Sequence, residues 1–128
     1  GDGCFRMNMN EIATATRSEI PVIEVVVNNH VLGMVRQWQN LFYGERYSST
    51  TLYDKVDFVK LAEAMGAKAK RVETIEEFEA AFKEAVASNE PYLLDCIIDS
   101  DDKVWPMVAP GAAISEAFDE QDLKEKRC

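Results

Sequence analysis

The feature that most constrains the fold is a run of β-branched residues near the N-terminus. Residues 22–27 are Val, Ile, Glu, Val, Val and Val, and the turn-forming Asn28 and Asn29 follow directly. Nearly continuous apolar strands of this kind are typical of a parallel sheet that is buried on both faces. We therefore expect residues 22–27 to form a central strand that ends at the two asparagines.

Helix-like and strand-like patterns alternate along the rest of the chain. Thr74 and Glu77 have the spacing of a capping box, which predicts the start of a helix. Residues 44–56 are polar and irregular, and are expected to form a loop. Alternation with buried strands predicts an α/β fold, a parallel sheet with helices on both faces and right-handed crossovers. The expected helices are residues 9–17, 34–43, 57–66 and 74–88, and the further strands are residues 67–72 and 92–98.

Composition and charge exclude several classes of partner. The 128 residues carry a net charge of -9 at pH 7, which argues against nucleic acid or an anionic membrane surface. No apolar stretch approaches the roughly 18 residues of a transmembrane helix. The three cysteines, Cys4, Cys96 and Cys128, match no zinc spacing. Cys96 lies in an apolar run, and we expect a buried thiol in a reducing, cytoplasmic compartment.

Two short polar segments are expected at the same edge of the sheet. Asn28 and Asn29 follow the apolar strand, and Gly1-Asp2-Gly3 has the composition of a loop that follows another strand. In open α/β sheets, ligands bind at the carboxyl ends of strands. Asp2 and Asn29 offer the hard oxygen ligands that magnesium prefers, and the glycines let the backbone approach a phosphate. The two segments together predict a magnesium–diphosphate site, and the strand missing before Gly1 predicts an N-terminally truncated domain.

The spacing of these two segments resembles that of thiamine-diphosphate enzymes. Gly-Asp-Gly is followed by 24 residues that hold a helix and a strand, and then by Asn-Asn. The resemblance implies that Asp2, Asn29 and the backbone carbonyl of Val31 bind magnesium. It also implies a set of cofactor-binding residues: Gly1, Asp2, Gly3, Asn29, Gly33 and Met34.

Within that class, the chain resembles the large, catalytic subunit of acetolactate synthases. The likeness is carried by residues 32–43, 58–66, 91–95 and 106–111, and runs from Gly1 to about Phe118. It implies that Met34 lies beneath the thiazolium ring and that Val35 and Trp38 line the substrate channel. Periodicity by itself favours the alternative that these three residues are helix core.

The resemblance also implies what a whole enzyme of this kind does. Such a transferase decarboxylates pyruvate and condenses the product with pyruvate or 2-ketobutyrate, in branched-chain amino-acid biosynthesis. It uses thiamine diphosphate, Mg²⁺ and FAD, forms a homo-oligomer and can have a regulatory subunit. The activating Glu and the FAD site belong to other domains, so we expect no catalytic residue here and no activity of the isolated chain. Residues 1–102 are expected to be the C-terminal part of the cofactor-binding domain, and residues 103–128 a tail.

Three alternatives stay open. The chain can belong to another thiamine-diphosphate enzyme, such as a pyruvate oxidase, a glyoxylate carboligase or a 2-ketoacid decarboxylase. It can belong to a catabolic acetolactate synthase without FAD, or be a non-catalytic, stand-alone cofactor-binding module. Gln37-Trp38 with Phe42-Tyr43 favours acetolactate synthase. The single histidine, His30, is assigned no catalytic role, because its position varies among the enzymes that the chain resembles.

Overall fold

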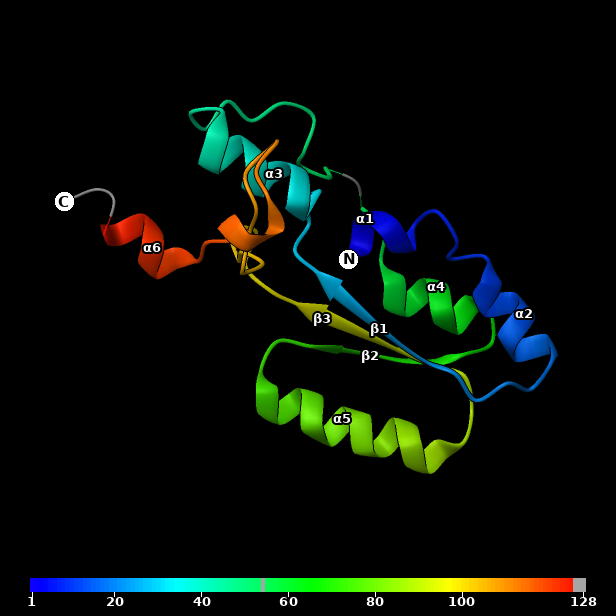
Figure 1. Cartoon of the computed structure of the whole chain (residues 1–128). Coiled ribbons are helices and arrows are strands. Elements are labelled where there is room, and N and C mark those ends of the chain that lie inside the picture. The colour runs from blue at the N-terminus through cyan, green and yellow to red at the C-terminus, as the bar shows by residue number, and fades with distance from the viewer. Residues whose placement is uncertain (54, 126–128) are drawn as a thin grey trace.

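The computed structural model describes residues 1–53 and 55–125. Its three strands form one parallel sheet with the order β1–β3–β2 (Figure 1). A short 3₁₀ helix, η1 (Ile114–Glu116), lies near the C-terminus. The remaining elements are α1 (Asp2–Phe5), α2 (Glu11–Arg17), β1 (Ile23–Asn28), α3 (Gly33–Phe42), α4 (Phe58–Ala64), β2 (Lys68–Val72), α5 (Ile75–Ser88), β3 (Tyr92–Ile97) and α6 (Glu120–Glu125).

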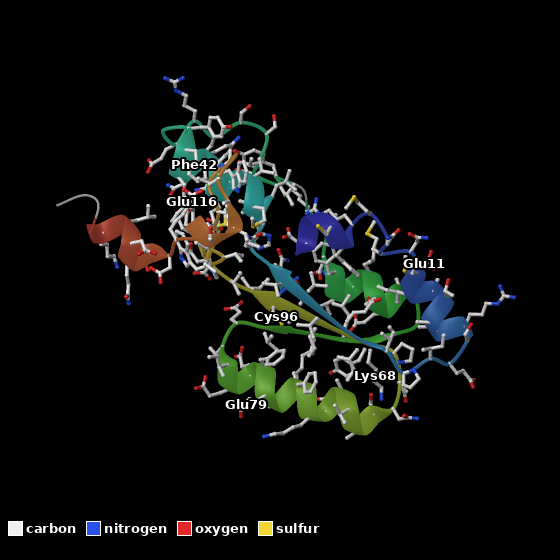
Figure 2. The ribbon with its side chains drawn as sticks, viewed as in Figure 1. Glu11, Phe42, Lys68, Glu79, Cys96 and Glu116 are labelled. Carbon is white, nitrogen blue, oxygen red and sulfur yellow. The ribbon has the colours of Figure 1, made fainter. Side chains whose placement is uncertain are left out.

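Helices cover both faces of the sheet, which confirms the predicted architecture (Figure 1). On one face, side chains of α2 and α4 pack against Val26 of β1 and Leu93 of β3. On the other face, α5 packs Ala81 and Ala85 against Leu94 and its neighbours. Figure 2 shows the side chains that fill the layer between α5 and the sheet. Because parallel strands end at the same edge, β1 and β3 both deliver their last residues towards α3.

The prediction that residues 22–27 form a central strand buried on both faces is wrong for the described chain. β1 is an edge strand, and only Val26 and Asn28 are buried. Val25 is 43% exposed and Val27 is 45% exposed. Their face is open because α5 contacts β2 and β3, and no described helix extends across β1 on that side.

The expected helices are present, with small differences at their ends. α5 begins as predicted, since Thr74 Oγ1 accepts a hydrogen bond from the Glu77 amide at 3.2 Å. The Glu77 carboxylate accepts from the amide of Glu73, one residue before the cap, at 2.8 Å. Asp57 caps α4, and Gly66 follows that helix with a φ of +88°, a conformation that favours glycine. Phe82 of α5 is 39% exposed and stacks on Phe78.

Three further expectations concern the first residues and the cysteines. Residues 2–5 form a helical turn, α1, so the prediction of a loop at Gly1–Gly3 is wrong. Helix α2 begins at Glu11, two residues later than expected. Cys4 and Cys96 are free thiols, and Cys96 is half-buried, with its pKa raised by burial and by the Asp95 charge. Cys128 lies outside the described residues.

The described part of the chain has no helix that is both long and apolar enough to cross a membrane.

Candidate functional site

Asp2 is a buried carboxylate without hydrogen-bond donors. It lies at the start of α1, is 0% exposed, and neither side-chain oxygen has a hydrogen-bond partner among the described residues. A nitrogen of Arg6 stands 3.9 Å from Oδ2. A charge buried without hydrogen bonds is costly unless it is paired or coordinates a metal. Arg6 thus forms a long ion pair with Asp2 without donating a hydrogen bond to it, and both carboxylate oxygens keep the capacity to bind a cation.

The end of β1 is shaped by two successive asparagine turns. Asn28 Oδ1 accepts from the amide of His30, and Asn29 Oδ1 accepts from the amide of Val31, both at 3.2 Å. His30 is exposed and has a φ of +58°, in the left-handed region. Asn and Asp side chains stabilise such turns because they mimic a backbone acceptor. This turn is therefore held by its own side chains.

The backbone carbonyl of Val31 points away from residues 50–52, the segment that pairs with it. Val31 pairs with Thr51 in an isolated antiparallel bridge. The hydrogen bonds of that bridge are made by the flanking residues: the Leu32 amide donates to the Thr50 carbonyl, and the Leu52 amide donates to the His30 carbonyl. The Val31 carbonyl takes no part in the bridge. This geometry is compatible with the predicted role of that carbonyl as a metal ligand.

Glycines bring the first residues of the chain against this turn. A Cβ on Gly1 would lie 3.7 Å from the Val27 carbonyl oxygen, and one on Gly3 would lie 2.7 Å from a Leu32 methyl carbon. A Cβ on Gly33 would lie 2.7 Å from Asn29 Nδ2, inside any normal contact distance. The two predicted segments thus meet at the carboxyl end of β1, with backbone accessible at each glycine.

A cavity of about 490 Å³ opens between these segments and α3. It contains the predicted residues Gly1, Gly3, Asn29, Val31, Gly33, Met34 and Val35 in its lining. Asp2 is buried beside the cavity and is absent from its lining, and Trp38 lies outside it. Gln37, part of the motif on α3, also lines the cavity. The sequence did not point to four other lining residues, which follow β3 and carry no recognisable motif: Ile98, Asp102, Lys103 and Val104.

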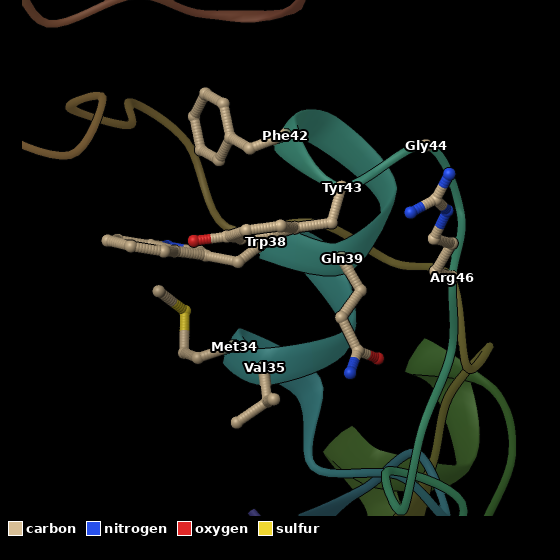
Figure 3. Close-up of a pocket in the computed structure, with 8 residues that line it drawn as sticks. All are labelled: Met34, Val35, Trp38, Gln39, Phe42, Tyr43, Gly44 and Arg46. Atoms are coloured by element: carbon tan, nitrogen blue, oxygen red, sulfur yellow. The ribbon is translucent and has the colours of Figure 1, made fainter.

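A second hollow, of about 1030 Å³, lies along the exposed side of α3 (Figure 3). Met34 and Val35 are each 49% exposed there, and Trp38 is half-buried. Figure 3 shows Met34, Trp38 and Phe42 projecting from α3 to the same side. Within the described residues these side chains form an open apolar wall, which is not the packed helix core that periodicity favours. The cavity of about 490 Å³ and this second hollow share Met34 and Val35 in their linings.

The segment that follows β3 fixes α3 beside both hollows. The Gln37 amide group donates to the Val104 carbonyl and accepts from the Val104 amide, both at 2.9 Å. Arg36 donates to both carboxylate oxygens of Asp101, which lowers the pKa of Asp101. Phe118 contacts Phe42 edge-on, with ring centroids 6.2 Å apart. The first part of the predicted tail therefore packs on α3, and the predicted boundary after residue 102 stays a prediction.

The donor set indicates which metal the site suits. Residues 1–53 and 55–125 contain no cluster of three or more His, Cys, Asp or Glu side chains that could hold a metal. Zinc and iron sites are normally built from such clusters. One carboxylate, one amide oxygen and one backbone carbonyl fit magnesium, whose remaining ligands come from phosphate and water. The residues present therefore fit a magnesium–diphosphate group.

The chain matches a known protein family over most of its length. The family model described as "Thiamine pyrophosphate enzyme, C-terminal TPP binding domain" matches residues 1–96. The chain belongs to this family, and its fold is that of a thiamine-pyrophosphate-binding domain.

The predicted resemblance to acetolactate synthase large subunits is also confirmed. The chain is 50% identical to the probable acetolactate synthase large subunit of Methanocaldococcus jannaschii, over 90% of this chain and 19% of that protein. It is 46% identical to the acetolactate synthase isozyme 2 large subunit of Escherichia coli, over 93% of this chain and 22% of that protein. The chain thus spans about a fifth of the length of these relatives.

Solved structures show the same fold. The benzoylformate decarboxylase of Polynucleobacter necessarius superposes with a TM-score of 0.74 at 28% identity, covering 82% of this chain and 20% of that one.

Proposed function

We propose that this chain is the magnesium- and diphosphate-binding part of an acetolactate synthase large subunit. The observation that carries the proposal is the meeting of two segments, Gly1–Gly3 and Asn28–Val31, beside one cavity, with a buried carboxylate at Asp2 that lacks donors. The identities of 46–50% to relatives that bear this name support the specific enzyme.

Each site residue has a proposed role. The side chains of Asp2 and Asn29 and the Val31 carbonyl would hold Mg²⁺, and Gly1, Gly3 and Gly33 would let the backbone approach the diphosphate. Met34 would support the thiazolium ring, while Val35 and Trp38 would line the path of the substrate. When bound, thiamine diphosphate supplies the stabilisation of a carbanion that the reaction requires.

The proposed reaction is decarboxylation of pyruvate and condensation with pyruvate or 2-ketobutyrate, a first step of branched-chain amino-acid biosynthesis. The activating Glu and the FAD site are proposed for parts of the whole enzyme outside this chain. A homo-oligomer and a regulatory subunit are also proposed for the whole enzyme. The free thiols of Cys4 and Cys96 support a reducing, cytoplasmic compartment.

Product analysis tests the proposed reaction. The protein that carries this chain is supplied with pyruvate, thiamine diphosphate, Mg²⁺ and FAD, and its products are identified. We expect 2-acetolactate, and 2-aceto-2-hydroxybutyrate when 2-ketobutyrate is added. The structural likeness to decarboxylases favours a decarboxylase as the second candidate. Acetaldehyde as the only product would therefore overturn the assignment to acetolactate synthase and favour that candidate.

A further inference from the structure

Asp95 is a second buried carboxylate, and none of the proposed site roles uses it. It is 0% exposed in the middle of β3, where its register neighbours are Val26 on β1 and Arg71 on β2. Leu93, two residues earlier on the same face, belongs to the apolar core. An apolar residue would pack at such a position without the desolvation that a carboxylate suffers. The partners of Asp95 therefore indicate what it does.

Asp95 joins two polar side chains from the neighbouring strands. Its Oδ1 accepts a hydrogen bond from Asn28 Nδ2 at 2.9 Å, and its Oδ2 accepts from Arg71 Nε at 3.0 Å. The other end of the Arg71 guanidinium donates to Asp57, the residue that caps α4, at 3.2 Å. Hydrogen bonding to Asp95 raises the pKa of Arg71, so the guanidinium stays charged. The Arg71 guanidinium on β2 thus neutralises the Asp95 carboxylate, and the same carboxylate holds the Asn28 side chain on β1.

This contact decides which way the Asn28 amide group points. A carboxylate only accepts hydrogen bonds, so Asn28 must turn its NH₂ group towards Asp95. Its oxygen is then directed to the His30 amide, and that 3.2 Å bond closes the first of the two asparagine turns. With the amide reversed, the NH₂ group would meet the His30 N–H, and the turn would lose this bond.

We propose that Asp95 is a positioning residue that fixes the Asn28 amide and thereby the turn that presents Asn29 and Val31 to magnesium. The inference depends on the proposed magnesium–diphosphate function and adds a residue to it. Groups that orient metal ligands from behind commonly contribute about 10–100-fold to metal affinity. The effect of Asp95 is expected in the magnesium dependence of cofactor binding.

Exchange of the two side chains tests the orientation directly. Asp95→Asn removes the constraint, because the new amide can either donate or accept. Asn28→Asp places two carboxylates against each other. The double variant, Asn28→Asp with Asp95→Asn, restores one amide–carboxylate pair with reversed polarity: Asn at 95 donates to Asp at 28, whose carboxylate accepts from the His30 amide. Asp57→Asn is the matched control, because it removes a carboxylate from Arg71, keeps a good helix cap and leaves Asn28 untouched.

The measurement is thiamine diphosphate binding to the protein that carries this chain, by calorimetry over a series of Mg²⁺ concentrations. We expect each single variant to raise the Mg²⁺ concentration for half-maximal binding about tenfold or more. We expect the double variant and Asp57→Asn to stay within about threefold of the unsubstituted protein. Melting temperatures measured alongside separate these changes from lost folding.

Two outcomes would overturn the inference. One is an unchanged magnesium dependence in both single variants. The other is a double variant as weak as Asp95→Asn, which would mean that the polarity of the pair does not matter. Cofactor binding by the unsubstituted protein that needs no Mg²⁺ would instead refute the proposed function itself, and the inference with it.

Discussion

Gly33 has no space for a side chain, and the atom that blocks it belongs to a proposed metal ligand. A methyl group at this position would meet Asn29 Nδ2 at 2.7 Å. Asn29 is held in place by its 3.2 Å hydrogen bond from the Val31 amide, so it would have to turn and lose that bond. The glycine therefore protects the orientation of Asn29.

We predict that Gly33→Ala lowers stability by about 1–3 kcal/mol, the usual cost of overpacking. Asn29→Ala removes the blocking atom. In that background Gly33→Ala should be neutral or stabilising, because alanine favours a helix more than glycine does. Thermal melting of the four proteins measures this coupling. An equal effect of Gly33→Ala in both backgrounds would show that the two residues do not touch as described.

Single residues also show how far the site can be predicted from sequence. The spacing of Asp2 and Asn29 pointed to one site, and the structure places their segments together. The sequence pattern shows Asp95 only as part of an apolar strand, because its role depends on a diagonal neighbour, Asn28, that lies 67 residues away in the chain. Lys103 lines the cavity through a loop whose path no local pattern specifies.

At the scale of elements, β3 carries a buried tyrosine that makes the sheet sensitive to alkaline pH. Tyr92 is 3% exposed, and its hydroxyl donates to Glu84 of α5 at 3.0 Å. Burial, followed by the hydrogen bond and charge of Glu84, raises the pKa of Tyr92 to about 12. An unfolded tyrosine titrates near pH 10.

The sign of the pH effect follows from these two pKa values. Between about pH 10 and pH 12, the unfolded chain loses the Tyr92 proton while the folded protein keeps it. The stabilising contribution of Tyr92 is therefore complete below about pH 10 and is lost as the pH rises through about 12. We predict a fall in melting temperature above about pH 10 that is smaller in Tyr92→Phe. Tyr53→Phe, at a position that is 88% exposed, should behave like the unsubstituted protein. A Tyr92→Phe curve parallel to the unsubstituted one would contradict the assignment.

The positions of helices and strands were predicted better than the packing around them. Apolar periodicity and the Thr74–Glu77 box located α5, because the signals that form a helix are local. The position of β1 was predicted wrongly, because apolar residues on both faces of a strand predict burial but not what covers it. In the described chain the second face of β1 is open, and Val25 and Val27 lie on it.

For the whole molecule, the sheet acts as a frame that brings distant residues to one edge. The carboxyl ends of β1 and β3, the α1 turn and the start of α3 converge at the cavity of about 490 Å³. The residue types in the sequence predict what kind of site this is. Only the fold shows that its separate segments lie close together. The central claim is that the Asp2 carboxylate binds the Mg²⁺ ion of a magnesium–diphosphate group.

Calorimetric titration of thiamine diphosphate into the protein that carries this chain, with and without Mg²⁺, tests this claim most directly. Asp2→Ala is compared with Glu11→Gln, which removes an exposed carboxylate on α2. We predict tight, Mg²⁺-dependent binding in the unsubstituted protein and in Glu11→Gln. In Asp2→Ala the affinity should fall about a hundredfold or more and lose its dependence on Mg²⁺, since a direct ligand contributes at least as much as the groups behind it. An Asp2→Ala protein with unchanged, Mg²⁺-dependent affinity would contradict the account.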